Sequence, residues 1–554
     1  MSARPPATSV DDAMLRALDA IFDPLRSTDA PGGLVGIALN AEVIYRKGFG
    51  LASVQHGVAN RPETRFRIAS TSKHFTCLAV LLLAEDGLLD IDAPAARYLP
   101  GLPAPRGAPT LRDFMAHTSG YRCTLEMGTI ANGYAAQPPA WQLQALLRQR
   151  DVHFAPGDGQ LYCNGTYHAL STIIERVSGM GFEDFMRQRI FEPLQMFDTA
   201  SVPDDALMVP GLSSPHVPDA LGGWRRPPVD SELRGDGGMV STLDDMLRWL
   251  AHLNGPRRIG DEATWQAMLA PTRLRNGFRS TYGLGLKRHD YRGVEIVHHS
   301  GGLLGLSGQM LTVPAMGLDV IIHVNGARAS AGGLARQVVD AVLGERLASL
   351  APLPAAASDF ANVVGHRFAG PGGLLLGFDA VDDHLALSLM FMHPQLVLQR
   401  RGDELIATFE DIGFGPLTWR VSELAQVGRG DDGDLLPLTI AGQRVLMRRI
   451  AAPAEVPAAL AAAWPGRYVC KDLGCEAEVA DRRDGIVLRL RGDYSGWRSF
   501  HVKALGRHHA GLESESRDER YAAEIDVPPG SGHAAGFWID SYRARRLRFE
   551  RTGA

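Results

Sequence analysis

The spacing of apolar residues changes near residue 350 of this 554-residue chain, and that change constrains the fold more than any single motif. Before this point, apolar residues three and four positions apart, which predict helices, alternate with short strand-like runs. After it, short alternating apolar runs broken by Gly and Asp indicate all-β structure. The Pro- and Ala-rich segment Leu350–Ser358 separates the two halves. The chain is also too long for one hydrophobic core, so we expect several domains.

The first half predicts an antiparallel sheet flanked by helices. We expect a β-hairpin over residues 33–49 and a long apolar helix from about Thr71 to Asp86, which Gly87 ends. Residues Ser241–Asp244 match a capping box that would open a helix reaching Leu253. The other expected helices are Asp11–Leu25, Thr110–His117, Ala140–Arg150, Thr166–Val177, Phe182–Phe191 and Gly332–Leu350, and the other expected strands are Val294–His299, Leu306–Val313 and Asp319–Asn325.

A second linker near Ala451–Ala463 divides the all-β half into two stretches of about equal length. The first opens with Val364–Phe368 and the second with Pro465–Tyr468, and each opening places Gly just before basic and aromatic residues. We interpret this as a weak internal repeat of roughly a hundred residues, each unit a small antiparallel barrel of about eight strands. One irregular β-sandwich is the alternative. The predicted domains are residues 1–350, 351–452 and 453–554.

Composition and charge exclude several classes of protein. The net charge is −5, and no stretch gathers Lys and Arg among aromatic residues, so no nucleic-acid partner is expected. The longest unbroken apolar run, Cys77–Ala84, is too short to cross a membrane, and no apolar leader follows Met1, so we expect a cytoplasmic protein without a membrane partner. Five cysteines cannot all pair, and Cys470 and Cys475 are expected to be structural. A homodimer is a candidate assembly.

Ser70 and Lys73 are the first candidates for catalysis. Lysine accounts for only five of the 57 basic residues, and unlike Arg it can give up its proton and act as a base. The two residues lie one helical turn apart at the start of the apolar helix, where a neutral amine could reach the serine hydroxyl. Free backbone N–H groups at a helix start also favour a developing oxyanion. The spacing alone is weak evidence, because one of five lysines has a Ser three positions before it by chance about one time in three.

Two further segments carry polar residues that could act on a substrate. The turn-rich segment Phe154–Gly165 precedes a helix and would present Tyr162 and Asn164 on an exposed edge, although a Tyr in such a place more often serves in packing. The segment His298–Gly302 ends a strand and begins a tight Gly turn. Its paired histidines would also suit a metal, but the sequence has neither an HExxH nor a CxxC motif, so we expect no metal and no cofactor.

In their order along the chain, these motifs resemble those of the penicillin-recognising serine hydrolases. Ser-x-x-Lys, Tyr-x-Asn and His-x-Gly occur at Ser70, Tyr162 and His299, within a region of about residues 30–345. They are most similar to the class C β-lactamase and DD-peptidase branch. The resemblance implies an α+β fold, with a β-lactamase/DD-peptidase-like catalytic domain whose antiparallel sheet is flanked by helices. Here that domain would be followed by two small antiparallel eight-stranded β-barrels.

The resemblance also implies a role for each residue. Ser70 would be the nucleophile that forms an acyl-enzyme, which water then hydrolyses. Lys73 and Tyr162 would share the general-base and general-acid work. Asn164 would hold the substrate amide, and the backbone N–H groups of Ser70 and Gly302 would form the oxyanion hole.

His299 marks a departure from the β-lactamase pattern, which has Lys-[Ser/Thr]-Gly where this chain has His299-Ser300-Gly301. A His with an ordinary pKa near 6.5 is mostly neutral at pH 7 and suits an uncharged or N-terminal-amine substrate. With two small β-domains behind it, the chain looks like the bacterial D-stereospecific D-aminopeptidases. That resemblance implies that a loop of the last barrel offers an acid to the substrate ammonium. The best match is Asp518, within the acidic run Glu513–Arg520, and a solvated hairpin tip is an equal alternative.

Three functions remain open on these residues. The first is a serine aminopeptidase that hydrolyses N-terminal D-amino acids, such as D-Ala, from peptides, amides and esters. The second is an esterase, DD-peptidase or β-lactamase-like hydrolase of the same fold. The third is a catalytically silent binding protein, which is disfavoured because all three motifs keep chemically competent residues.

Overall fold

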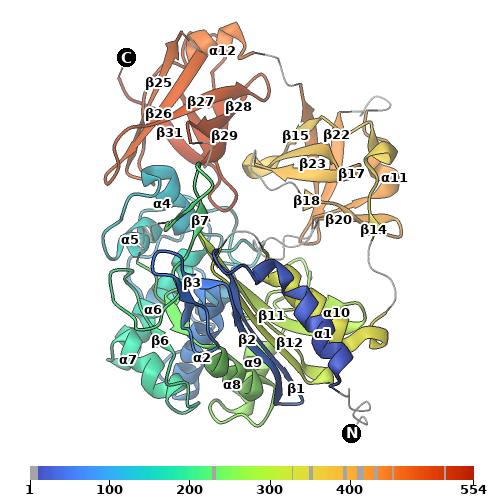
Figure 1. Ribbon diagram of the computed structural model, residues 1–554. Coiled ribbons are helices and arrows are strands. Elements are labelled where there is room, and N and C mark those ends of the chain that lie inside the picture. Colours follow the sequence, from blue (N-terminus) through green and yellow to red (C-terminus); the bar gives the residue numbers. More distant parts are fainter. Residues whose placement is uncertain are drawn as a thin grey trace.

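The chain forms a helix-flanked antiparallel sheet followed by two curled β-structures (Figure 1). The computed structural model describes residues 10–227, 232–326, 329–348, 353–390, 396–407, 417–428, 434–451, 455–483, 485–516 and 519–553. The sheet and its helices come from residues 12–346, the middle β-structure from residues 353–450 and the last from residues 466–551. The predicted α+β fold class is confirmed, including a closed eight-stranded barrel at the end of the chain.

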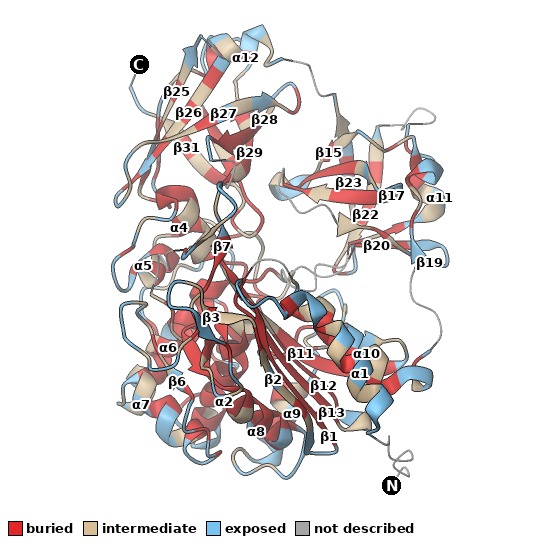
Figure 2. Ribbon diagram, in the orientation of Figure 1, coloured by how far each residue is buried: buried red, intermediate tan, exposed pale blue. Residues whose placement is uncertain are grey.

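The central sheet has six antiparallel strands. Their order is β10 (Lys287–Tyr291), β11 (Val294–Leu303), β12 (Leu306–Val313), β13 (Leu318–Val324), β1 (Gly33–Leu39) and β2 (Glu42–Phe49). The predicted hairpin is β1 and β2, and the predicted strand over residues 306–313 is β12 with the same bounds. Every residue of β1 and β13 is buried, which explains why both strands are mostly apolar, although β13 also buries Asp319 and His323 (Figure 2).

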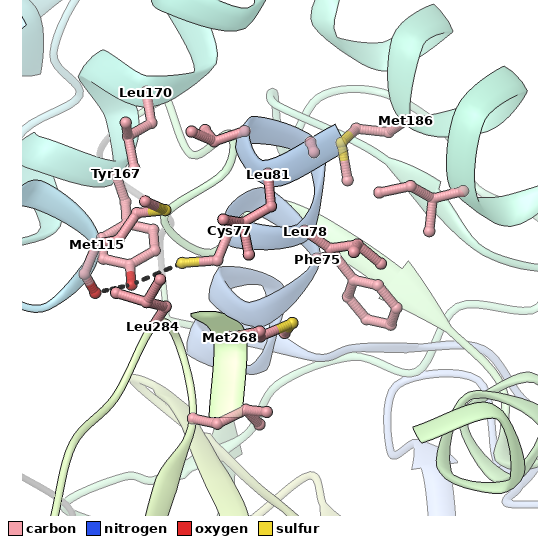
Figure 3. Packing of buried hydrophobic residues seen from close by; sticks show 14 of the residues in the cluster. Phe75, Cys77, Leu78, Leu81, Met115, Tyr167, Leu170, Met186, Met268 and Leu284 are labelled. Atoms are coloured by element: carbon pink, nitrogen blue, oxygen red, sulfur yellow. Dashed lines mark hydrogen bonds between the residues drawn. The ribbon is translucent and has the colours of Figure 1, made fainter. Parts of the chain in front are cut away.

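Helices cover both faces of this sheet. On one face, α1 (Asp12–Ile21) and α10 (Ala331–Leu343) share a core with Val35 and Ile37 of β1. On the other face, α2 (Ser72–Glu85) and α8 (Leu243–Asn254) share a core with Leu34 of the same strand. Figure 3 shows α2 within the second core, where Cys77 Sγ lies 3.2 Å from the Tyr167 hydroxyl. The other helices of this part are α3 (Leu111–Met115), α4 (Thr124–Asn132), α5 (Trp141–Leu147), α6 (Asn164–Ser178), α7 (Phe182–Met186) and α9 (Glu262–Leu269).

Several helix ends differ from the sequence-based expectations. The predicted capping box at residues 241–244 is wrong by one residue, because Ser241 belongs to strand β9 (Met239–Ser241) and the cap is Thr242, whose side chain accepts from the Asp245 N–H. The last helix of the domain ends at Leu343 because Gly344 adopts a φ of +47°. The sequence patterns did not indicate α4 or α9. The remaining short strands here are β3 (Leu51–Ser53), β4 (Val58–Ala59), β5 (Phe66–Arg67), β6 (Ala200–Ser201), β7 (Val217–Pro218) and β8 (Trp224–Arg225).

The middle β-structure is a ten-stranded sheet that curls into a nearly closed barrel, where eight strands were expected. Its additional strands are short ones. Residues Leu353–Pro354 of the first linker pair with Gln399–Arg400, which adds β14 to the edge of the sheet. The strands lie in the order β14 (Leu353–Pro354), β19 (Gln399–Arg401), β20 (Glu404–Ala407), β21 (Leu417–Arg420), β22 (Leu435–Ile440), β23 (Gln443–Ile450), β15 (Arg367–Ala369), β16 (Leu375–Val381), β17 (His384–Leu389) and β18 (Leu396–Val397), with helix α11 (Val421–Leu424) after β21.

The closed barrel packs against helices α4 and α5 of the first half of the chain. Met127 and Ile130 of α4 and Trp141 of α5 belong to the same apolar cluster as the interior of the barrel, which lies beside these two helices in Figure 1. Burial of the apolar side chains in this shared cluster stabilises the contact between the barrel and the two helices. Helix α12 (Ala458–Ala463) precedes the barrel, whose strands are β24 (Gly466–Cys470), β25 (Cys475–Arg482), β26 (Gly485–Gly492), β27 (Arg498–Ala504), β28 (His509–Ser514), β29 (Arg520–Asp526), β30 (Gly536–Asp540) and β31 (Leu547–Arg551).

The described residues contain no helix that is both long and apolar enough to cross a membrane. They also place no group of three or more His, Cys, Asp or Glu side chains where it could hold a metal ion. All five cysteines are buried with free thiols, as expected for core residues. Cys470 and Cys475 face each other across β24 and β25.

Candidate active site

Ser70 lies in a single 3₁₀ turn, Ala69–Thr71, between β5 and α2. Ala69 has a φ of +47°, a left-handed conformation that costs a non-Gly residue free energy and sets the direction of the next side chain. Strand β11 passes close to this turn: a Cβ atom on Gly301 would stand 2.2 Å from the carbonyl oxygen of Ile68. Gly at position 301 therefore lets the strand end and the serine turn approach each other.

Lys73 Nζ lies 3.2 Å from Ser70 Oγ and 2.7 Å from Asn164 Oδ1, and it also contacts the backbone carbonyl oxygen of Asp236. The residue is completely buried. Burial lowers the pKa of Lys73 to about 7, although the charge of the Asp236 carboxylate counteracts part of this effect. The amide oxygen of Asn164 and the carbonyl oxygen of Asp236 can only accept hydrogen bonds. A neutral amine would donate its two N–H groups to them and direct its lone pair at Ser70 Oγ.

Tyr162 and Asn164 are buried, so the predicted exposed edge is wrong. Asn164 is the first residue of α6, and the ring of Tyr162 lies 4.7 Å from Lys73 Nζ. Burial raises the pKa of Tyr162 well above its ordinary value, and the nearby Ser70 offsets only part of this effect. Tyr162 is therefore a phenol, a proton donor, at neutral pH. His117 packs against it with ring centroids 4.1 Å apart, which fixes the ring.

His299 of β11 is also buried, and both of its ring nitrogens have neighbours. The Ser300 carbonyl oxygen lies 2.6 Å from Nδ1, and the Tyr282 hydroxyl lies 3.1 Å from Nε2. Because a carbonyl oxygen only accepts, Nδ1 carries the proton and Nε2 accepts from Tyr282. Burial and the positive charges of Lys287 and Lys73 hold the pKa of His299 well below its usual range. His299 is thus neutral, as the sequence predicts for this position.

These residues surround one cavity of about 300 Å³. Five of the residues singled out from the sequence line it, namely Ser70, Tyr162, Asn164, His299 and Gly302. Lys73 lies behind them, in contact with Ser70 and Asn164. A Cβ atom on Gly302 would meet no atom within 4 Å, so the backbone at this position is open to a ligand in the cavity.

Three charged residues of the cavity were missed in the sequence: Asp236, Lys287 and Arg543. The Asp236 carboxylate is buried and accepts hydrogen bonds from Gln142 Nε2 and from the backbone N–H of Arg234. The sequence signal for Asp236 was its place directly before the Gly237–Gly238 pair. Lys287 begins β10 and pairs with His298, next to His299. Neither position stands out by periodicity.

Arg543 comes from the loop between β30 and β31 of the closed barrel. A loop of the last barrel thus reaches the cavity, and the described residue that lines it is a cation. Asp518, the predicted acid, lies outside the described residues. Two other acids of its run already have ion-pair partners: Glu513 pairs with Lys503 and Arg520, and Glu519 pairs with Arg498.

Comparisons with known proteins identify relatives of this chain. A D-aminopeptidase of Brucella canis is 31% identical over 320 residues, which are 57% of this chain and 60% of that protein. A D-aminopeptidase of Cereibacter sphaeroides is 29% identical over 424 residues, 72% of this chain and 79% of that protein. The matched part thus spans less than two thirds of the Brucella relative.

Solved structures show the same fold at low sequence identity. The octameric penicillin-binding protein homologue from Pyrococcus abyssi is 18% identical, with a TM-score of 0.53 over 97% of this chain and 99% of that one. The D-amino acid amidase from Ochrobactrum anthropi SV3 is 23% identical, with a TM-score of 0.51 over 60% of this chain and 99% of that one. The family model described as Beta-lactamase matches residues 16–343, more than half of the sequence. The chain belongs to the beta-lactamase family.

Proposed function

We propose that the protein is a serine hydrolase that removes N-terminal D-amino acids, such as D-Ala, from peptides, amides and esters through an acyl-enzyme. The observation that carries the proposal is the buried Lys73 amine, 3.2 Å from Ser70 Oγ and with a pKa of about 7. Such an amine is a base at neutral pH. The relatives named D-aminopeptidase support the choice of substrate.

In the proposed acylation, Lys73 Nζ accepts the Ser70 hydroxyl proton while Oγ attacks the substrate carbonyl carbon. The carbonyl oxygen becomes an oxyanion, which the backbone N–H groups of Ser70 and Gly302 stabilise. As the C–N or C–O bond breaks, the Tyr162 hydroxyl donates a proton to the leaving group. Tyr162 then recovers a proton from Lys73, which returns to the neutral form. Asn164 Oδ1 accepts a hydrogen bond from Lys73 Nζ, so Asn164 positions the base and also borders the substrate.

In the proposed deacylation, a water molecule replaces the leaving group and attacks the ester carbon of acylated Ser70. Lys73 and Tyr162 move the water proton to Ser70 Oγ, which releases the D-amino acid. His299 stays neutral throughout, and its hydrogen bonds to Tyr282 and Ser300 shape this side of the cavity. We keep Asp518 as the proposed acceptor for the substrate ammonium.

A panel of p-nitroanilides tests the substrate class. We expect D-Ala-p-nitroanilide to be hydrolysed about 10- to 100-fold more efficiently, in kcat/KM, than the N-acetyl-D-Ala compound, because losing one charge-assisted contact costs one to two factors of ten. The L-Ala compound should also be hydrolysed more slowly, because its inverted Cα cannot place the ammonium and the scissile carbonyl in the same positions together. Heat-inactivated enzyme is the blank. Equal rates on the free and the N-acetylated compound would contradict the aminopeptidase proposal.

The alternative function, an esterase, DD-peptidase or β-lactamase-like hydrolase, has one specific observation in its favour. Lys287 and Arg543 both border the cavity, and cations there suit a substrate that carries a carboxylate. Benzylpenicillin belongs in the same panel for this reason. We expect it to be a poor substrate, because the position that is Lys in the resembling β-lactamases is the neutral His299 here. Rapid turnover of benzylpenicillin would favour the alternative.

The pH dependence of kcat/KM should identify the base. Below pH 7 the Lys73 amine takes up a proton and can no longer accept one, so kcat/KM should fall about tenfold per pH unit below an apparent pKa near 7. Asp236→Asn removes a charge that raises the pKa of Lys73, so the same limb should move to lower pH. The profile is measured from pH 5 to 9. If the fall in kcat/KM occurred at the same pH in the Asp236→Asn variant, the group that titrates near pH 7 would not be Lys73.

The cytoplasmic location and the homodimer expected from the sequence remain part of this proposal. The Pyrococcus neighbour is described as octameric, which is a property of that protein. We also expect neither a cofactor nor a metal to take part, because the proposed steps use only Ser70, Lys73, Tyr162 and backbone N–H groups.

A further inference from the structure

Arg543 is fixed on the cavity by contacts that join the barrel loop to the segment before and within α4. Its carbonyl oxygen accepts from the Cys123 N–H at 2.9 Å, and its own N–H donates to Glu126 Oε2 at 2.6 Å. Two residues further along the loop, the carbonyl oxygen of Arg545 accepts from Arg122 Nε at 2.6 Å. The loop therefore holds the Arg543 side chain at the cavity with backbone as well as side-chain contacts.

The guanidinium of Arg543 uses only part of its hydrogen-bonding capacity. Nε donates to Glu126 Oε1 at 2.7 Å, and the group lies 5.5 Å from the centre of the Tyr162 ring. The side chain is 20% exposed. Among the described residues, the structure gives no hydrogen bond to Nη1 or Nη2, which together carry four N–H donors. A carboxylate in the cavity could accept two of them side by side.

The charges around Arg543 leave this position attractive to an anion. Glu126 already accepts from Ser541 Oγ at 3.0 Å as well as from the two nitrogens of Arg543. Among the described residues that line the cavity, Asp236 is the one carboxylate, and its oxygens accept from Gln142 and from a backbone N–H. Lys287 adds a second cation to the same cavity.

Arg543 lies on the side of the cavity formed by Asn164. Asn164 Nδ2 lies 3.4 Å from Cys123 Sγ, and the N–H of Cys123 donates to the Arg543 carbonyl oxygen. If Asn164 holds the amide on the acyl side of the substrate, these contacts place the backbone of Arg543 beside the group that is transferred to Ser70, and the guanidinium is proposed to extend toward that group. The leaving group, which Tyr162 protonates, need not carry the charge.

We propose that Arg543 binds a carboxylate on the acyl part of the substrate, so that the enzyme prefers an acidic N-terminal D-residue, D-Asp or D-Glu. This inference rests on the proposed function, because it specifies the side chain of the D-amino acid that is released. Arg543 acts as a specificity-determining residue and takes no part in bond making or breaking.

The test compares D-Glu-p-nitroanilide with D-Gln-p-nitroanilide, which has the same shape without the charge. The wild-type ratio of kcat/KM should be about 10 to 100 in favour of D-Glu, the effect of one charge-assisted pair. Arg543→Gln should bring the ratio close to 1, because activity on D-Glu should fall about 10- to 100-fold further than activity on D-Gln. The ratio is measured within each variant, so a partly unfolded preparation does not alter it.

Two further variants separate charge from loop structure. Glu126→Gln removes the counter-charge of Arg543, so the preference for D-Glu should rise, whereas a purely structural role of the pair predicts the same loss in both variants. Arg548→Gln is the matched control, because Arg548 pairs with Asp526 and does not line the cavity. Its ratio should equal that of the wild type.

The outcomes distinguish this inference from the proposed function. Efficient hydrolysis of D-Ala-p-nitroanilide without a preference for D-Glu over D-Gln would overturn the role of Arg543 and leave the function standing. If no D-aminoacyl compound is hydrolysed, a binding measurement tests the role of Arg543 instead. Free D-glutamate should then raise the Tm of the Ser70→Ala protein more than D-glutamine does. Loss of that difference in the Ser70→Ala, Arg543→Gln double variant would support the inference, and its persistence would refute it.

Discussion

Replacing Ser70 by Ala should lower turnover of D-Ala-p-nitroanilide by about four or more factors of ten, because it removes the hydroxyl that lies beside the Lys73 amine. The fold should survive, since Ser70 is half-buried in a short turn and Ala is compatible with it. Rates are measured at saturating substrate, and unfolding is followed by circular dichroism. A serine-reactive phosphonate followed by mass spectrometry should label the wild type at Ser70 and leave the variant unlabelled.

Ser72, two positions further on, provides the matched control. Its hydroxyl donates to the Ala69 carbonyl oxygen at 2.7 Å and accepts from the Met239 N–H at 3.2 Å, and it is completely buried. Ser72→Ala should therefore cost about 1–3 kcal/mol of stability and keep the nucleophile. If Ser70→Ala retained activity within tenfold of the wild type, the acyl-enzyme mechanism would be wrong.

The part of the site that the sequence could predict is the part that is local in the chain. Ser70 and Lys73 are three residues apart, so one turn of helix is enough to place Nζ near Oγ, and the structure has them 3.2 Å apart. Tyr162, Asn164 and His299 were identified by residue type and order through a family resemblance. Their burial was not predicted, because it depends on how α6 and β11 pack around the serine turn.

Arg543 could not be predicted, because its position depends on packing between distant parts of the chain. Its hydrogen bond to Glu126 spans 417 residues. The contact exists because the apolar face of α4, with Met127 and Ile130, shares a core with the barrel. Arg543, Arg545 and Arg546 follow β30 in a single short turn, and nothing in their local sequence tells which one faces a cavity.

The number of strands in the middle β-structure was underestimated for a similar reason. β14 contains two residues of the Pro- and Ala-rich linker, and its pairing with β19 is set by the neighbouring sheet edge. β18 also has only two residues, Leu396–Val397, too few for the alternation of apolar residues that marks a strand. Such short strands form by pairing with a neighbouring strand, so their own sequences show little of the pattern that predicts a strand.

Lys73→Arg should be nearly as damaging as Lys73→Met, with kcat/KM reduced about 100- to 10,000-fold in both. Arginine keeps a positive charge but has no lone pair at neutral pH, so it cannot accept the Ser70 proton. Lys73 is completely buried, with Nζ 4.7 Å from the ring centre of Tyr162 and 5.4 Å from that of Tyr167. The longer guanidinium would also displace the contact with Asn164.

The measurement that isolates basicity is the pH profile of acylation in these variants. If Lys73 is the base, the residual activity of both variants should no longer show the limb near pH 7, since the group that titrates there is gone. Lys503→Arg is the matched control, because Lys503 lies on the barrel and pairs with Glu513 away from the cavity; its rate and profile should match the wild type. If Lys73→Arg is active with an unchanged profile while Lys73→Met is inactive, Lys73 acts as a fixed cation. The proton from Ser70 must then go to another group, and Tyr162, a titratable side chain of the same cavity, would be the one to examine.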